Sequence, residues 1–204
     1  AFDGDADRCG FVDEHGAIVT MDLIAALIAG EILEAGPAPI LYDLRSSWAV
    51  KEYIEEHGGT PVRSRVGHAF IKEEMRRHDA PFAGELAGHY YFRENFYTES
   101  SGLAMIMIAN ILSKVGKPLS EVAAPLQRYA PSGEINSKVG EPEAVLDAIR
   151  KRYSDGNQFE LDGVSVEYED WWFNVRLSNT EPLLRLCVEA RTKELMAEKR
   201  DELL

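Results

Sequence analysis

The sequence predicts an α/β protein in two parts: a mixed α/β domain built from βαβ units, followed by a smaller α+β domain with an antiparallel sheet. Between residues 39 and 83, short apolar strands alternate with helical stretches, which is typical of a parallel sheet. From residue 159 onward, several strands follow one another with only turns between them, which indicates an antiparallel sheet. A length of 204 residues also exceeds a typical domain of roughly 150, so one large or two modest domains are expected.

The first part is predicted from hydrophobic periodicity and from turn and cap residues. Its expected elements are a hairpin with arms Cys9–Val12 and Ala17–Val19, a helix Met21–Ala35 with Thr20 as N-cap, strand Pro39–Tyr42, helix Ser46–His57, strand Val62–Arg65, helix His68–His78, strand Pro81–Ala83, strand Tyr90–Phe92, helix Leu103–Leu112 and a helix from Pro118 to about Arg128.

The second part is expected to begin after Ala130–Gly133, which is short, turn-rich and without periodicity and therefore reads as a domain boundary. Its expected elements are a strand, helix Pro142–Tyr153, strands Phe159–Leu161, Val164–Tyr168, Trp172–Leu177 and Leu184–Ala190, and a closing helix from Thr192. The pair Trp171-Trp172, next to Phe173, is interpreted as core packing.

The composition is that of an ordinary globular protein, with 45% hydrophobic and 28% charged residues. No apolar run approaches the roughly 20 residues that span a bilayer, and no basic-then-apolar leader begins the chain. Cys9 and Cys187 lie far apart, so we expect reduced thiols and a cytoplasmic location, with a disulfide left open. A net charge of −13 argues against nucleic acid or an anionic membrane as partner.

An acidic loop stands at the start of the sequence, where Asp3, Asp5 and Asp7 alternate and can turn three carboxylates to one centre. Oxygen ligands favour Mg²⁺ or Ca²⁺ over zinc. An EF-hand calcium loop fits in part, with Glu14 at its twelfth position, but its sixth position requires glycine and holds Arg8. The plain alternative is a solvated acidic turn.

A second loop, Gly84–His89, offers groups suited to sugar hydroxyls. The carboxylate of Glu85 can accept two hydroxyls, and His89 can reach a third or move a proton. Gly84 and Gly88 would let the backbone approach a ligand closely. The alternative is a glycine-rich turn with a structural salt link.

A third loop, Arg176–Pro182, can cradle a phosphate. Arg176 supplies a planar fork of donors, and Ser178, Asn179 and Thr180 supply two hydroxyls and an amide. The alternative is a polar turn between two strands.

A sugar phosphate carries about −1.5 to −2 charges, so this acidic chain must collect positive charge locally. The basic candidates for this are Arg8, Arg45, Lys72, Arg176 and Arg185. Arg45 follows a strand, where a site residue would lie, or it faces solvent. His68 and Lys72 share one helix face, by function or by chance.

Together these loops resemble the α-D-phosphohexomutase family, the phosphomannomutase and phosphoglucomutase group. The family's metal loop Asp-Gly-Asp-x-Asp-Arg is matched by Asp3–Arg8, and its phosphate loop Arg-x-Ser-Asn-Thr-x-Pro by Arg176–Pro182. Its sugar loop Gly-Glu-x-Ser-Gly-His is matched by Gly84–His89, except that Ala87 replaces serine. The segment Gly67–Lys72 is similar to the family's Gly-His-Ser-x-Ile-Lys.

The resemblance implies a fold of four domains around a cleft. Residues 1–19 would end domain two and carry the metal loop, residues 20–130 would form the sugar-binding domain three, and residues 131–204 the phosphate-binding domain four. The implied reaction moves phosphate between the 1- and 6-hydroxyls of a hexose, through a phosphoserine and a bisphosphorylated intermediate.

The resemblance also implies the role of each site residue. Mg²⁺ would be held by Asp3, Asp5 and Asp7 together with an oxygen of the phosphoserine. The implied catalytic residues are Arg8 and His89, and the implied substrate-binding residues are Arg45, His68, Glu85, His89, Arg176, Ser178, Asn179 and Thr180. The partners would be hexose phosphate, hexose bisphosphate and the N-terminal domains of the same enzyme.

Two departures from the family's pattern shape the functional prediction. No Thr-Ala-Ser-His-Asn-like serine loop occurs in the sequence, so we expect a C-terminal fragment that is inactive by itself. Ala87 removes a hydroxyl that helps to hold the sugar, which bears on the substrate preference and not on the class. The stretch Tyr90–Glu94 resembles the mannose/glucose branch, and Leu86 stands where the glucosamine branch usually carries Gln. We therefore predict a phosphomannomutase first and a phosphoglucomutase second, with a phosphoglucosamine mutase or a non-catalytic phosphosugar- or metal-binding module left open.

Overall fold

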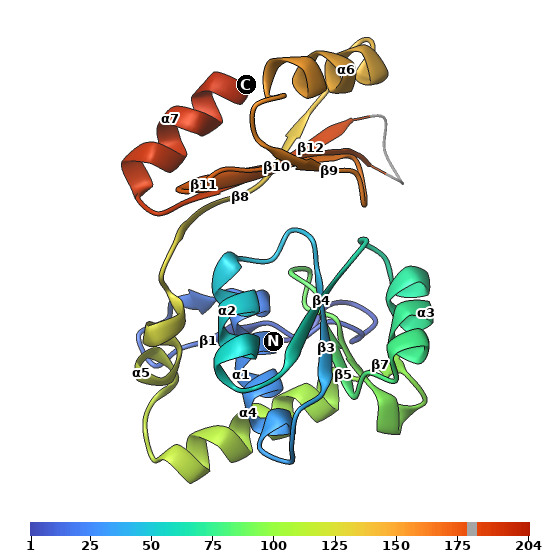
Figure 1. The fold of residues 1–204 in the computed structure, drawn as a ribbon. Coiled ribbons are helices and arrows are strands. Elements are labelled where there is room, and N and C mark those ends of the chain that lie inside the picture. The colour runs from blue at the N-terminus through green and yellow to red at the C-terminus, as the bar shows by residue number, and fades with distance from the viewer. Residues whose placement is uncertain (179–182) are drawn as a thin grey trace. The chain divides into compact units, whose positions relative to one another are not determined.

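The structure is a computed structural model that describes residues 1–178 and 183–204. The chain forms two compact units, Ala1–Gln127 and Arg128–Leu204. Each unit has its own sheet, and Figure 1 shows both.

The first unit contains a mixed five-stranded sheet. Three parallel strands lead into an antiparallel edge, in the order β4-β3-β5-β6-β7. Their bounds are β3 Pro39–Asp43, β4 Thr60–Ser64, β5 Phe82–Gly84, β6 Tyr90–Phe92 and β7 Thr98–Glu99. Because β3, β4 and β5 are parallel, the loops that follow them open at one edge of the sheet.

Helices cover both faces of this sheet, which makes an α/β/α sandwich (Figure 1). Helices α1 (Met21–Leu33) and α2 (Trp48–Glu56) pack on one face, with α4 (Ser101–Val115) beside α1, and α3 (His68–His78) packs on the other. The side chains alternate accordingly. Leu41, Ala83 and Tyr91 meet Ile71 and Met75 of α3 in one buried cluster.

Two short segments complete the first unit. A hairpin of β1 (Phe11–Val12) and β2 (Ile18–Val19) follows the acidic loop, as predicted. Helix α5 (Leu119–Ala123) is shorter than predicted, because Pro125 has no N–H to continue the α-helical ladder. The chain continues there as a 3₁₀ turn, Ala124–Leu126.

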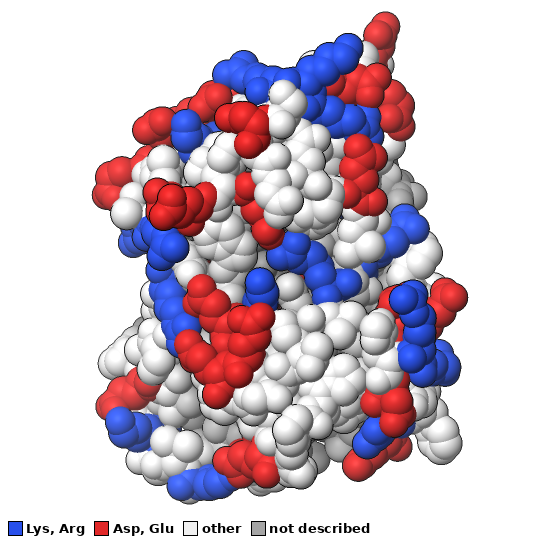
Figure 2. All heavy atoms as spheres, viewed as in Figure 1, with Lys and Arg blue, Asp and Glu red and all other residues white. Residues whose placement is uncertain are grey.

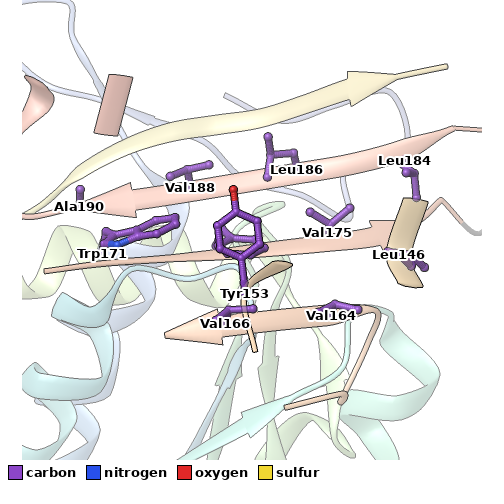
Figure 3. Close-up of a cluster of buried hydrophobic side chains, with 11 residues drawn as sticks. Leu146, Tyr153, Val164, Val166, Trp171, Val175, Leu184, Leu186, Val188 and Ala190 are labelled. Carbon is purple, nitrogen blue, oxygen red and sulfur yellow. The ribbon is translucent and has the colours of Figure 1, made fainter. Parts of the chain in front are cut away.

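The second unit contains an antiparallel sheet in the order β8-β12-β11-β10-β9. Its strands are β8 Ala130–Ser137, β9 Asn157–Phe159, β10 Val164–Glu167, β11 Trp171–Leu177 and β12 Leu184–Ala190. Helices α6 (Pro142–Arg152) and α7 (Lys193–Leu203) pack on one face, over the apolar cluster in Figure 3. The predicted fold class of both parts is thus confirmed.

The structure corrects two details of the second part. Ala130–Gly133, read as an irregular boundary, begins strand β8, which pairs with β12. The first strand after α6 ends at Phe159 rather than beginning there. Both tryptophans are buried, as predicted. Trp171 joins the apolar cluster, and Trp172 lies on the opposite face of the sheet, where it donates to Glu189 over 2.8 Å.

Within the described residues, no single helix has the length and apolarity that a membrane crossing requires. One pair, Ser101–Val115 with Leu119–Leu126, meets those criteria jointly but is bent by 94°.

Candidate metal, sugar and phosphate sites

The acidic loop brings its three carboxylates together. One oxygen from each of Asp3, Asp5 and Asp7 lies within 4.8 Å of the other two. Ala6 turns the chain between them with a left-handed φ of 60°, and its carbonyl oxygen accepts a 2.6 Å hydrogen bond from the hydroxyl of Ser101 at the start of α4. The loop is therefore fixed by a helix that lies about 95 residues further along the chain.

Arg8 is the counter-ion of this cluster. Its Nε donates to Asp3 over 2.7 Å and lies 3.7 Å from Asp7 Oδ1. Partial burial opposes the ionised form of Asp3, but the hydrogen bonds from Arg8 prevail and hold the pKa of Asp3 below its ordinary value. Asp7 Oδ1 is buried and accepts no hydrogen bond from the described residues. An all-oxygen cluster with one unsatisfied carboxylate oxygen fits a hard cation such as Mg²⁺.

Glu14, at the twelfth position of the EF-hand pattern, does not face the acidic loop. Both carboxylate oxygens of Glu14 bind Ser120 at the start of α5, one through the backbone N–H and one through the hydroxyl. Glu14 therefore anchors a helix N-terminus and does not turn to the acidic loop.

The sugar loop begins where β5 packs closely on α1. A Cβ added at Gly84 would lie 2.3 Å from Ala25 Cβ, so glycine is required here by helix packing. This differs from the expectation that Gly84 serves close approach to a ligand. The loop then turns tightly, because Gly88 N donates to Glu85 O and Glu85 N donates to His89 O, each over 3.0 Å.

Glu85 is buried at the sheet edge, with 3% of its surface exposed. Its Oε1 accepts a 2.5 Å hydrogen bond from the hydroxyl of Tyr91, and its Oε2 lies 3.7 Å from Arg45 Nη2. Burial, and next the charge of Asp43, raise the pKa of Glu85 above its ordinary value. Burial and Glu85 likewise raise the pKa of Tyr91, so its phenol stays a donor.

His89 joins the sugar loop to the acidic loop. Its Nε2 lies 3.2 Å from Asp7 Oδ2, and its Nδ1 lies 3.5 Å from Glu85 Oε1. The backbone links the same two loops, since Cys9 N donates to Gly88 O over 3.1 Å. Segments about 80 residues apart in the sequence therefore form one cluster.

Arg45 is buried, so the alternative in which it faces solvent is wrong. Its guanidinium binds the carboxylate of Asp43, with Nη2 to Oδ2 at 2.6 Å and Nε to Oδ1 at 3.2 Å. Neither Asp43 nor Tyr91 was predicted as a site residue from the sequence. A polar residue that ends an apolar strand was the available signal for Asp43, whereas Tyr91 reads as an ordinary core residue.

His68 and Lys72, two further candidates for binding the substrate, lie at the start of α3. His68 is exposed. Lys72 pairs with Glu99 of β7 over 2.6 Å and lies 6.0 Å from the ring centre of Tyr91. Partial burial opposes ionisation of Glu99, but Lys72 prevails and lowers its pKa. Lys72 is therefore already paired, whereas His68 faces solvent.

In the second unit, Arg176 is almost fully buried on β11. Its Nη2 donates to Glu134 Oε2 over 2.9 Å, and the other oxygen of Glu134 accepts from Arg185 Nη1 over 3.0 Å. Arg176 and Arg185 are opposite one another on β11 and β12. The single carboxylate of Glu134 therefore pairs with both positive charges. The buried Nε–H of Arg176 has no hydrogen-bond partner among the described residues.

The backbone of β11 at Val175 and Arg176 leaves no space for a side chain at Gly163, in the neighbouring turn. A Cβ at Gly163, where φ is +69°, would lie 2.2 Å from Val175 O and 2.6 Å from the Cα of Arg176. Ser178 N donates to Leu183 O over 2.9 Å. The predicted ligands Asn179 and Thr180 lie outside the described residues.

Acidic residues outnumber basic ones in the sequence, 35 to 22. On the face that Figure 2 shows, acidic and basic side chains lie side by side over both units. The positive charge available to an anionic ligand is therefore local, as in the pair Arg176 and Arg185, which share one carboxylate.

Two family profiles together match nearly the whole chain. Residues 20–129 match the phosphoglucomutase/phosphomannomutase alpha/beta/alpha domain III, and residues 134–204 match the C-terminal domain of the same family. The chain therefore belongs to the phosphoglucomutase/phosphomannomutase family, a family of isomerases in carbohydrate metabolism. The resemblance noted from the three loops is thus confirmed.

The relatives show how much of a family member the chain represents. It is 47% identical to a phosphomannomutase of Methanocaldococcus jannaschii over 203 residues, which are 99% of this chain and 45% of the relative. A phosphoglucomutase/phosphomannomutase family protein of Burkholderia thailandensis superposes with a TM-score of 0.86 at 32% identity, over 98% of this chain and 44% of the other. The chain thus spans less than half the length of these relatives.

A more distant structure shares the fold. N-acetylphosphoglucosamine mutase of Aspergillus fumigatus, determined with GlcNAc-6P and magnesium, superposes with a TM-score of 0.70 at 18% identity, over 100% of this chain and 47% of the other.

Proposed function

We propose that this chain provides the metal, sugar and phosphate sites of a phosphohexomutase that interconverts hexose 1-phosphate and hexose 6-phosphate, with mannose phosphates as the preferred substrates. Residues 1–19, 20–130 and 131–204 would act as the end of domain two, domain three and domain four. The identity of 47% to a phosphomannomutase supports mannose as the sugar. A cytoplasmic location is part of the proposal, and the two free cysteines are consistent with it.

One observation carries the proposal: the contact of 3.2 Å between His89 Nε2 and Asp7 Oδ2. It brings a cation cluster and a group suited to sugar hydroxyls to the same point. Phosphoryl transfer depends on positioning and charge neutralisation, and adjoining cation and sugar sites are what such a reaction requires.

In this proposal Asp3, Asp5 and Asp7 would hold Mg²⁺, which would neutralise charge on the phosphate of a phosphoserine. The magnesium of the Aspergillus structure supports that choice of cation. Arg8, which binds Asp3 in the structure, would contact the same phosphate. Glu85 would accept sugar hydroxyls, and His89 would position a hydroxyl or transfer a proton.

The phosphate that does not react would bind in the second unit. Arg176 would present its unpartnered Nε–H, together with Ser178, Asn179 and Thr180. Arg45, just after the end of β3, and His68, at the start of α3, would face the substrate. The phosphoserine itself is not encoded here, so we expect binding but no turnover by the chain alone.

A titration followed by nuclear magnetic resonance tests this proposal. Mannose 6-phosphate, glucose 6-phosphate, glucosamine 6-phosphate and unphosphorylated mannose are compared with Mg²⁺ present. We expect the tightest binding for mannose 6-phosphate, with shifts at Glu85 and Arg176, and none for mannose. Tighter binding of glucose 6-phosphate or glucosamine 6-phosphate would reassign the sugar. Equal binding of all four would contradict the proposal.

A magnesium titration tests the cation cluster separately. Asp5→Asn should weaken Mg²⁺ binding about tenfold or more, because a charged ligand is lost. The matched control is Asp170→Asn, which changes an exposed aspartate paired with Arg191 in the other unit. Equal affinities of the two variants would remove the metal from the proposal.

A further inference from the structure

Asp43 accepts four hydrogen bonds at the sheet edge. It is the last residue of β3 and is fully buried. Its Oδ1 accepts from the backbone N–H of Arg45 over 2.8 Å and from Arg45 Nε over 3.2 Å. Its Oδ2 accepts from Arg45 Nη2 over 2.6 Å and from the backbone N–H of Leu86 over 2.8 Å. An ionised carboxylate has about four lone-pair sites, so Asp43 is saturated.

These bonds fix two different loops to one point. Arg45 belongs to the loop after β3, and Leu86 belongs to the sugar loop after β5, 43 residues from Asp43. The two strands are parallel neighbours, with Tyr42 paired to Gly84. The backbone hydrogen bonds between β3 and β5 align the ends of the two strands. The side chain of Asp43, the next residue after Tyr42, then binds the loop that follows β5.

Asp43 also decides which carboxylate the buried guanidinium of Arg45 engages. The Arg45 side chain is 6% exposed, and a buried cation needs a hydrogen-bonded counter-ion. Two carboxylates lie near Nη2, Asp43 Oδ2 at 2.6 Å and Glu85 Oε2 at 3.7 Å. Because Asp43 takes the short contact, Arg45 stays beyond hydrogen-bond distance of Glu85. Without the charge of Asp43, the carboxylate of Glu85, 3.7 Å from Arg45 Nη2, is close enough for Arg45 to turn to it.

We infer that Asp43 is a positioning residue of the sugar site: it sets the Glu85 loop against β3 and keeps Arg45 from occupying the Glu85 carboxylate. This inference rests on the proposed function, in which Glu85 and Arg45 face the sugar phosphate. Asp43 itself touches no substrate, because it is buried and all of its acceptor sites are taken.

Asp43→Asn is the direct test, because asparagine keeps the shape and one acceptor oxygen but loses the charge. We expect mannose 6-phosphate to bind about tenfold to a hundredfold more weakly, as for the loss of a hydrogen bond to a charged group. Asp79→Asn is the matched control, since Asp79 is an exposed aspartate at the end of α3 that pairs with Arg93. Its affinity should equal that of the parent chain, and Asp43→Asn binding equally well would overturn the inference.

A second variant separates positioning from a merely structural role. If Asp43 acts through Arg45, the double variant Asp43→Asn/Arg45→Gln should bind mannose 6-phosphate as Arg45→Gln does. Independent effects would multiply instead, and a further tenfold loss in the double variant would refute the role through Arg45. The double variant leaves neither of these two buried charges unpaired, so its binding can be measured even if Asp43→Asn alone does not fold.

Hydrogen exchange of the Leu86 amide gives a readout that needs no ligand. In Asp43→Asn this amide should exchange at least about tenfold faster, while the Tyr42 and Gly84 amides of the ladder stay unchanged. If the parent chain does not bind mannose 6-phosphate, the proposed function fails, and the Leu86 exchange rate alone decides the role of Asp43. An unchanged rate would contradict the inference whatever the binding result.

Discussion

Gly84→Ala should destabilise the first unit, because strand β5 lies against helix α1 with no space for a methyl group. The added Cβ would lie 2.3 Å from Ala25 Cβ, whereas a comfortable carbon–carbon contact is about 3.5 Å. Ala25 is 4% exposed, and its methyl cannot rotate away. The strand or the helix must therefore shift by about 1.2 Å.

The size of the effect follows from this overlap. Overpacking a close-packed core costs about 1–3 kcal/mol, and with backbone on both sides we expect about 3 kcal/mol here. Ala25→Gly removes the opposing methyl and should cost about 1 kcal/mol as a glycine within a helix. In the double variant the new Cβ would lie 3.6 Å from Ala25 Cα, an ordinary contact.

Urea unfolding of the parent chain and the three variants measures this coupling. The double variant should lose about 1 kcal/mol rather than the additive sum of about 4 kcal/mol. Gly84→Ala should also weaken mannose 6-phosphate binding, because Glu85 follows directly, and Ala25→Gly should restore that binding. Additive destabilisation, with no rescue of binding, would refute the reasoning from the close contact.

Three further predictions concern the other loops. Ala6→Gly should stabilise the protein by up to about 1 kcal/mol in thermal unfolding, because Ala6 has a φ of 60°; a loss of stability would show that the left-handed turn is not strained. Glu85→Gln should change the pH dependence of stability. Burial raises the pKa of Glu85 in the folded protein, so the native state keeps a proton that the unfolded chain has lost, and this residue makes stability fall as pH rises from about 4.3 to its folded pKa. Urea unfolding at several pH values should show that this fall is absent from the variant, and parallel curves would contradict it. Glu134→Gln should destabilise the second unit toward the lower end of about 3–5 kcal/mol, because Arg176 and Arg185 lose their shared carboxylate; an unchanged urea midpoint would show that the pair does not need it.

The sequence predicted most elements because each has a strong local signal. The helix over residues 68–78 and the strand over residues 184–190 were placed with the bounds that the structure has. The failures have physical reasons. Ala130–Gly133 has turn composition but becomes a strand through pairing with β12, a contact that no local pattern encodes.

The site shows the same division between local and distant information. The three carboxylates of the acidic loop are close in sequence, so their clustering was predictable. The role of Gly84 was not, since it depends on Ala25 in a helix about 59 residues away. Asp43 was missed for the same reason, because its importance lies in the bond from Leu86.

The most direct measurement is a calorimetric titration of the chain with mannose 6-phosphate, repeated with Arg176→Ala and with the control Arg191→Ala. Arg191 is an exposed arginine of the same unit, paired with Asp170. If the chain carries a phosphosugar site, the parent and the control should bind alike, and Arg176→Ala should lose about tenfold or more of the affinity. Binding that is unaffected by Arg176→Ala, or absent from the parent chain, would contradict the account of this site.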